Sequence, residues 1–279
     1  MKILLAYFTG TYNTLFLTNI MANFLKNKGH VVEVKAIDYK IKFNADKYDL
    51  IGIGYPIHYF NAPKFISKML IDNKVKNKKI FIYKNGSKSE SSASSLSLIK
   101  TSRKNKFINE YHFLMPSNIN ASFDNNFISY LLKKNVLYID HITSNIENER
   151  RLAYSFNDKL KTFFGKAKLN KIRKSIKRNM VDKSKCIRCR KCTSFCPVGN
   201  IKYDKLVRRI VFYSNCEACL RCVNFCPSDA ISYNELTKLK QENTYVFNIN
   251  ELNNVDVDIT NNELYMANKS YFDMIDSLK

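Results

Sequence analysis

All eight cysteines of this 279-residue chain lie in one segment, between Cys186 and Cys226, so they form a local site. They occur in two runs with the same spacing, C-x2-C-x2-C-x3-C-P. Such runs hold cubane [4Fe–4S] clusters, and the fourth cysteine of one run ligates the neighbouring cluster. The spacing therefore predicts two clusters, one ligated by Cys186, Cys189, Cys192 and Cys226, and the other by Cys216, Cys219, Cys222 and Cys196.

The two cysteine runs are also an internal repeat. Aligned from Cys186 and from Cys216, they share four cysteines, a phenylalanine, a proline and an isoleucine, which predicts approximate two-fold symmetry. Zinc and disulfides are the alternatives to iron. Zinc prefers four ligands that come as two separated pairs, so three closely spaced cysteines in C-x2-C-x2-C fit a single tetrahedral zinc site poorly. Clustered cysteines in a reducing cytoplasm are more often metal ligands than disulfides.

A second candidate site follows the first apolar run. The residues Thr9-Gly10-Thr11-Tyr12-Asn13-Thr14 stand where a helix should begin. The free N–H groups and the dipole of a helix N-terminus favour an anion such as phosphate. An ordinary Thr or Asn cap is the alternative. The chain contains neither G-x-G-x-x-G nor G-x4-G-K-[ST], so dinucleotide and P-loop sites lose support.

The elements that must position these residues follow from the hydrophobic pattern. Up to about residue 157, short apolar runs alternate with amphipathic stretches, as in a parallel sheet covered by helices. We expect strands at Lys2–Phe8, Val31–Ile37, Leu50–Gly54, Lys79–Tyr83 and Glu110–Met115. We expect helices at Asn13–Lys28, Pro63–Ile71, Ser92–Lys104 and Phe127–Leu137. This order favours an α/β fold with a flavodoxin-like, doubly wound, five-stranded parallel sheet.

The loop at 9–14 resembles the phosphate loop of flavodoxins, which typically reads T/S-x-T-G-N-T, and the resemblance implies FMN as a cofactor. Tyr12 stands where the family usually has glycine. A positive φ at Tyr12 would store on the order of 1 kcal/mol of strain and reduce flavin affinity. The resemblance also implies flavin loops after strands three and four, at Gly54–Pro63 and Lys84–Ser87.

The resemblance makes twelve residues candidates for binding the cofactor: Thr9, Gly10, Thr11, Tyr12, Asn13, Thr14, Pro56, Ile57, His58, Tyr59, Asn85 and Gly86. His58 or Tyr59 would stack on the flavin, because the chain has no Trp. A loop histidine hydrogen-bonded to the backbone is the alternative for His58.

The order of a flavodoxin-like half, a basic segment and a two-cluster half resembles the flavodoxin–ferredoxin fusion family. The resemblance rests on Gly54–Pro63, Glu110–Asn118 and the cysteine runs, and it implies FMN and two [4Fe–4S] clusters. Asn118 is a further flavin-loop candidate. We expect a flavodoxin-like domain at 1–164, a basic linker at 165–180, a small α+β two-cluster ferredoxin-like domain at 181–235 and an acidic, Asn-rich extension at 236–279.

The chain is strongly basic, with 46 Lys and Arg against 24 Asp and Glu and a net charge of +22. Nine basic residues and no acidic one lie within 159–178, which we interpret as a connector. This charge favours docking to acidic redox proteins, with a merely solvated lysine-rich surface as the alternative. Nucleic acid is disfavoured, because no recognised module accompanies the charge. The acidic segment 241–279 could fold back onto the basic part.

No run reaches the roughly 18 apolar residues of a membrane helix, and we expect a cytoplasmic protein. No nucleophile with a base partner and no paired carboxylates support hydrolysis, so we expect no catalytic residue. The predicted function is low-potential transfer of single electrons between FMN and the clusters. Two alternatives stay open. One is a flavin and iron–sulfur reductase with a small substrate beside His58 and Tyr59, and the other is a ferredoxin with a flavin-free, flavodoxin-like docking domain.

Overall fold

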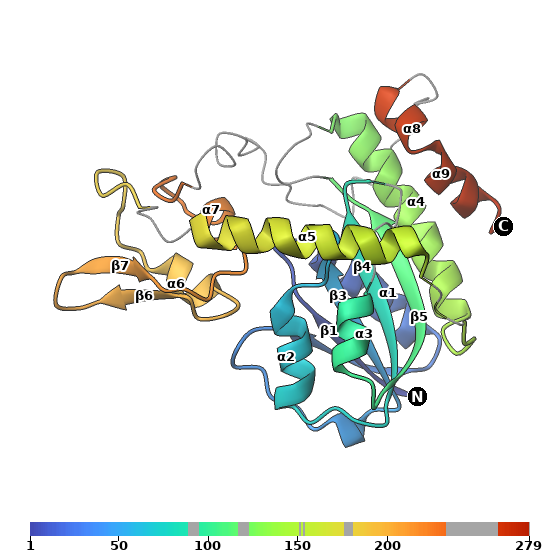
Figure 1. The fold of residues 1–279 in the computed structure, drawn as a ribbon. Coiled ribbons are helices and arrows are strands. Elements are labelled where there is room, and N and C mark those ends of the chain that lie inside the picture. Colours follow the sequence, from blue (N-terminus) through green and yellow to red (C-terminus); the bar gives the residue numbers. More distant parts are fainter. Residues whose placement is uncertain are drawn as a thin grey trace.

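The computed structural model describes residues 1–88, 95–116, 123–150, 152, 154–175, 181–232 and 262–278. Its N-terminal part contains a five-stranded sheet with the order β2-β1-β3-β4-β5, and all neighbouring strands are parallel (Figure 1). This is the flavodoxin-like order of doubly wound folds, as the sequence predicts. The strands are β1 (Lys2–Tyr7), β2 (Val31–Ala36), β3 (Leu50–Pro56), β4 (Lys79–Gly86) and β5 (Lys106–Leu114).

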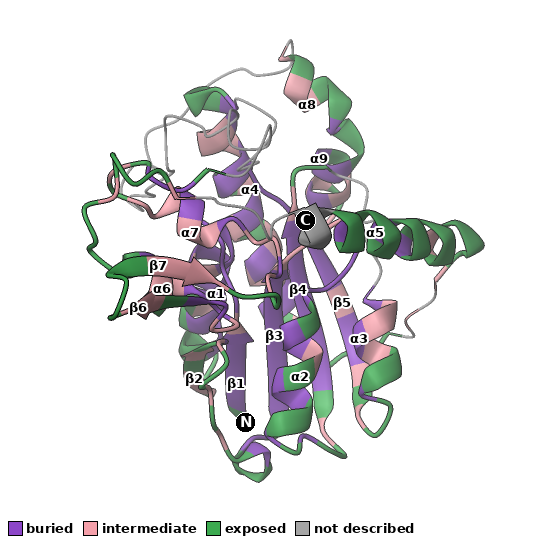
Figure 2. Cartoon of the chain, turned by 60° about the vertical axis from the view of Figure 1, so that its left-hand side comes forward, coloured by how far each residue is buried: buried purple, intermediate pink, exposed green. Residues whose placement is uncertain are grey.

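Helices cover both faces of this sheet. Side chains alternate along β1, so Ile3 and Leu5 share a core with α1 (Asn13–Asn27) and α4 (Asn125–Ser144). Leu4 and Ala6 point to the opposite face, into a core formed with α2 (Lys64–Asp72) and α3 (Leu96–Thr101). Burial on both faces explains why β1, β3 and β4 are almost continuously apolar, as Figure 2 shows for the strand interiors. A 3-10 turn, η1 (Ala45–Lys47), precedes β3.

The expected strands and helices of this part are all present, but several of their ends differ. β3 continues to Pro56 and β4 to Gly86, so the expectation that Lys84–Gly86 belong to a loop is wrong. Parallel pairing holds these residues in the sheet, since Pro56 is in register with Asn85. α4 begins two residues early because the side chain of Asp124 caps it, accepting a hydrogen bond from Phe127 N at 2.8 Å.

The basic segment that we expected to be a connector is largely helical. α5 (Phe156–Ser175) runs across the carboxyl ends of the strands (Figure 1), and the predicted boundary at residue 164 falls inside it. Thr162, Gly165 and Leu169 are buried, whereas most of the lysines are exposed. None of the helices within the described ranges combines the length and the apolar character needed to span a membrane.

The cysteine segment forms a separate small unit beside the carboxyl edge of the sheet (Figure 1). It contains two short helices and an antiparallel hairpin, which agrees with the predicted small α+β domain. The helices are α6 (Lys191–Phe195) and α7 (Arg221–Asn224), and the strands are β6 (Ile201–Asp204) and β7 (Arg209–Phe212). A bridge between Val181 and Ile231 joins the two ends of the unit.

The end of the acidic extension packs on α4. α8 (Glu263–Ala267) and α9 (Lys269–Asp276) lie beside that helix (Figure 1), while 241–261 lie outside the described residues. Tyr271 donates a hydrogen bond to Asn135 Oδ1 at 2.6 Å, and Lys134 pairs with Asp276. The contact is mainly apolar and aromatic, so charge alone did not reveal it.

A buried ion pair connects β4, β5 and the start of α5. Lys84 is only 1% exposed and pairs with Glu110 of β5. Ser95 donates a hydrogen bond to Glu110 at 2.9 Å, and Tyr154, just before α5, donates another. Burial lowers the pKa of Lys84, whereas the neighbouring Glu110 opposes this shift. The pair anchors the approach to α5 above the sheet.

Replacing Lys84 by Met should therefore destabilise the protein strongly. Glu110 would remain buried without its cation, and breaking such a pair costs about 3–5 kcal/mol. Urea unfolding followed by circular dichroism measures the loss. The double variant Lys84→Met with Glu110→Gln is the control, because the uncharged glutamine keeps the shape of Glu110 and can accept one of the two hydrogen bonds from Ser95 and Tyr154 while its NH2 group donates to the other hydroxyl. A single variant as stable as this double variant would contradict the argument.

Candidate cofactor sites

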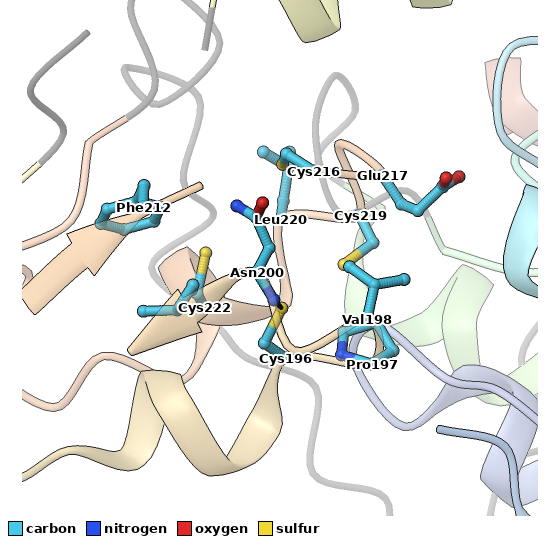
Figure 3. Close-up of a pocket in the computed structure, with 11 residues that line it drawn as sticks. Cys196, Pro197, Val198, Asn200, Phe212, Cys216, Glu217, Cys219, Leu220 and Cys222 are labelled. Atoms are coloured by element: carbon cyan, nitrogen blue, oxygen red, sulfur yellow. Dashed lines mark hydrogen bonds between the residues drawn. The ribbon is translucent and has the colours of Figure 1, made fainter. Parts of the chain in front are cut away.

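The structure brings the eight cysteines together as two sets around two pockets. We call the first set site one, and it comprises Cys186, Cys189, Cys192 and Cys226. We call the second set site two, and it comprises Cys196, Cys216, Cys219 and Cys222, which Figure 3 shows around one pocket. In each set, three cysteines come from one run and the fourth from the other run. The grouping is the one that the spacing predicts, and ligation of iron by these thiols stays a prediction.

Apolar side chains complete both pockets. Val198, Ile201 and Phe212 line site two, and Val181, Ile210 and Ile231 line site one. Among the described residues, no three His, Cys, Asp or Glu side chains gather tightly enough to hold a single metal ion. Each pocket thus presents four thiols from different sides in an apolar surrounding.

The two cysteine loops repeat one backbone conformation. Positive φ angles occur two and four residues after the first cysteine of each run, at Arg188, Arg190, Ala218 and Leu220. One further positive φ angle occurs three residues after the fourth cysteine of each run, at Gly199 and at Asp229. Left-handed conformations are costly for residues other than glycine, so the same costly turns at equivalent positions indicate a common requirement. Their effect is to wrap each loop around its pocket.

The fourth cysteine of each run accepts an equivalent hydrogen bond. Asn200 N lies 3.1 Å from Cys196 Sγ, and Ala230 N lies 3.3 Å from Cys226 Sγ. In both cases the donor is the backbone N–H four residues later. Hydrogen bonds to cysteine sulfur are among the determinants of cluster potential. The backbone N–H groups of Asn200 and Ala230 therefore supply part of the hydrogen bonding that would set the potential of each cluster.

The buried thiols Cys192 and Cys219 are not suited to ionise without a cation. Burial is the main reason that the pKa of Cys219 is raised to about 12, and neighbouring Cys216 and Cys196 contribute to this shift. Burial likewise raises the pKa of Cys192 to about 11, with Cys189 and Cys226 adding to the shift. A positively charged metal centre reverses this balance, because it stabilises thiolates directly. The donor set therefore fits an iron–sulfur cluster in each pocket.

The loop after β1 offers buried and unpartnered hydroxyls. Thr9 and Thr11 are each 4% exposed, and within the described residues neither Oγ1 atom has a hydrogen-bond partner. Both precede α1, whose first N–H groups and dipole favour an anion. Thr14 instead donates to Asn85 Oδ1 at 2.7 Å, and Asn13 donates to Pro116 O at 2.9 Å. The loop therefore fits a phosphate group at Thr9 and Thr11, with Asn13 and Thr14 holding its frame.

Tyr12 adopts the strained conformation that the sequence suggested. Its φ is 71°, in the left-handed region, and its ring contacts Phe225 of the cysteine unit at 4.9 Å between centroids. Such an edge-to-face pair is worth about 0.5–1.5 kcal/mol. This contact offsets strain of similar size and gives a reason for a tyrosine at this position.

The candidates after β3 and β4 meet at the carboxyl edge of the sheet. Ile57 Cδ1 would lie 3.3 Å from a Cβ built on Gly86. His58 and Asn61 pair across a tight turn, with Tyr59 and Phe60 at its tip in the left-handed region. Asn118 and residues 89–94 lie outside the described residues, so these parts of the expected flavin loops stay untested.

α5 packs directly on this turn. A Cβ on Gly165 would lie 2.0 Å from the Tyr59 carbonyl oxygen, so only glycine fits there. Asn61 Nδ2 donates to Thr162 O at 3.1 Å, and Lys168 Nζ lies 5.6 Å from the centre of the Tyr59 ring. The basic helix thus covers the loop that the sequence analysis assigned to the flavin ring.

Replacing Gly165 by Ala should loosen this helix from the turn. In an exposed helix the change would add about 1 kcal/mol of helical preference, but here the new methyl group meets the Tyr59 carbonyl. We expect faster amide exchange along α5, measured by hydrogen–deuterium exchange. Ala167→Gly on the exposed side is the control, since it lowers helix propensity and leaves the contact intact. Faster exchange in the control than in Gly165→Ala would contradict the argument.

Three residues of this region escaped the sequence analysis. Glu217 accepts a hydrogen bond from Lys64 N at 3.2 Å and thereby caps α2, whose preceding residue is a proline. The Arg221 guanidinium lies 5.8 Å from the centre of the Phe225 ring. Gly165 was hidden in a lysine-rich stretch. For Glu217 the repeat offered a signal, because the two runs differ at this position: Glu217 stands where the first run has Ile187.

Comparison with known proteins identifies the cysteine unit. The profile of the 4Fe-4S dicluster domain matches residues 178–227, which contain all eight cysteines. A search of curated proteins finds no match.

Several solved structures are similar to the N-terminal part. A flavoprotein in complex with FMN from Lactobacillus acidophilus is 13% identical over 40% of this chain and 92% of that chain, with a TM-score of 0.35. The flavodoxin of Streptococcus pneumonia TIGR4 is 12% identical over 53% of this chain and 98% of that chain, with a TM-score of 0.38. A flavodoxin from the domain Archaea is 12% identical, covers 53% and 100%, and has a TM-score of 0.35.

Proposed function

We propose that this chain, in which a flavodoxin-like domain precedes a 4Fe-4S dicluster domain, is an electron-transfer protein that passes single electrons between FMN and two [4Fe–4S] clusters. The observation that carries the proposal is the contact between the two candidate sites. A Cβ on Gly10 of the phosphate loop would lie 3.4 Å from the carbonyl oxygen of Cys219 in site two. When bound, FMN can exchange two electrons and each cluster one, so the pair would connect two-electron and one-electron reactions.

The residues of the chain would serve as binding groups in this function. The thiols of site one and site two would ligate iron, and Thr9 and Thr11 would donate hydrogen bonds to the FMN phosphate. The Ile57–Tyr59 turn and Gly86 would contact the flavin ring.

The free thiols and the net charge of the proposed carrier indicate its cellular compartment and the kind of partner that it would bind. All eight cysteines are free, which suits the reducing cytoplasm. The net charge of +22 suits acidic redox partners, whose approach it would accelerate. We do not propose the small-substrate reductase, because α5 lies on the Tyr59 turn where its substrate would have to enter.

The test is anaerobic purification followed by iron, sulfide and FMN analysis. We expect about eight iron per chain and one FMN, because each cubane cluster holds four iron atoms. Flash photoreduction of the flavin should then be followed by bleaching of the cluster absorbance. Iron without FMN, even after FMN is added, would favour a ferredoxin with a flavin-free docking domain. Zinc in place of iron would overturn the proposal.

A further inference from the structure

The cysteine loop of site two packs against the flavodoxin-like domain, whereas site one contacts that domain through Phe225, the residue before Cys226, whose ring lies 4.9 Å from that of Tyr12. Cys219 and Val198 pack against the core that contains Phe8 and Phe65. Glu217, between the first two cysteines of the second run, is 9% exposed and caps α2 through Lys64 N. The cysteine loop of site two is therefore built into the carboxyl edge of the sheet, next to the phosphate loop.

Site one presents its equivalent loop to solvent. Ile187 occupies the repeat position of Glu217 and is 65% exposed, and the thiol-bearing residue Cys189 is exposed as well. Arg188 and Arg190 are exposed at the positions where the second run has Ala218 and buried Leu220. The two runs therefore share their cysteines, but the residues between the first three cysteines are exposed in the first run and buried or half-buried in the second.

Five cationic residues lie within four positions of the exposed Ile187 along the chain. We call this group the basic rim, and it comprises Lys183, Lys185, Arg188, Arg190 and Lys191, all exposed. Within the described part of the chain none of the five forms an ion pair. Arg190 stacks on Tyr203 at 4.0 Å, which holds one of the cations in place. An apolar centre with a charged, solvated border is the usual anatomy of a protein-docking surface.

We infer that the two sites have different partners. Site two exchanges electrons with the flavin domain, and the basic rim of site one docks an acidic iron–sulfur protein. In the outward direction one electron leaves the cluster of site one, which is oxidised, and reduces the iron–sulfur centre of the docked protein. No bond forms or breaks. This inference rests on the proposed function, and it adds the order of the sites and the place of docking.

The test compares two triple variants with the same change in net charge. Lys183, Lys185 and Lys191 are replaced by Glu in the rim variant, and the exposed Lys159, Lys166 and Lys171 of α5 in the control variant. The probe is an acidic two-cluster ferredoxin, and its Kd for the loaded protein is measured by isothermal titration calorimetry at low salt. We expect the Kd of the rim variant to rise by at least about tenfold, because the complementary charges that steer and hold the acidic partner are lost.

The outcomes separate the docking surface from the proposed function. Equal weakening in both variants, or greater weakening in the α5 variant, would overturn the rim as the docking surface, as would absence of ferredoxin binding to the parent protein. Internal transfer from flavin to clusters, measured by flash photoreduction, should stay unchanged in the rim variant. If the parent protein lacks that internal transfer, the proposed function fails independently of how the ferredoxin binds.

Discussion

Replacing Thr9 and Thr11 together by Val should weaken FMN binding by about 100-fold or more, while it stabilises the FMN-free protein. Both hydroxyls are buried and have no partner within the described residues. Two hydrogen bonds to a charged phosphate contribute about 1.5–3 kcal/mol each, which gives the loss in affinity. A buried hydroxyl without a partner costs about 1–3 kcal/mol, so its removal raises the free energy of unfolding of the empty protein.

Flavin fluorescence quenching measures the affinity, and urea unfolding of FMN-free protein measures the stability. Thr18→Val is the matched control on α1, because Thr18 Oγ1 already bonds Thr14 O at 2.6 Å and Tyr83 OH at 3.0 Å. We expect the control to lose stability and keep its FMN affinity. A double variant that loses stability like the control would show that the two hydroxyls have partners in solution, and the phosphate assignment would fail.

Local chemistry was predictable from the sequence, and contacts between distant segments were not. Cysteine spacing predicted the two sets, because the short links within each run bring three thiols to one pocket. The apolar runs predicted the sheet, because strands buried on both faces need them. The helical character of α5 was missed, since its buried side uses Thr162, Gly165 and Leu169 among many lysines. A buried helix face of this composition can be recognised only once the turn that it packs against is known.

Tyr12 shows how the two kinds of information combine. Its departure from the flavodoxin pattern predicted strain, and φ of 71° agrees. The sequence could not show why the strain is tolerated, because the contact with Phe225 joins residues more than 200 positions apart. Lys64 and Glu217, whose carboxylate caps α2, are 153 positions apart, and no local sequence pattern signals their contact either.

Replacing Cys219 or Cys189 by Ala should block electron flow at different points, although both are the second cysteine of their run. Each variant is expected to lose the cluster of its own site, about four of eight iron atoms, because the ligand set of a cubane is then incomplete. Iron analysis and electron paramagnetic resonance measure this loss. Retained FMN binding in both variants confirms that the flavodoxin-like domain is intact.

The two variants should differ in which transfer survives. Without a cluster in site two, flash-reduced flavin should no longer reduce the remaining cluster, because the proposed path runs through site two, where the Cys219 carbonyl oxygen lies 3.4 Å from a Cβ built on Gly10 of the phosphate loop. Without a cluster in site one, internal transfer to site two should persist, and reduction of an acidic ferredoxin should cease. The reverse pattern would place site one next to the flavin. The contacts of Cys219 and Glu217 with the flavodoxin-like domain distinguish two sites that are equivalent in spacing, so this pair of variants tests what the fold adds to the repeat.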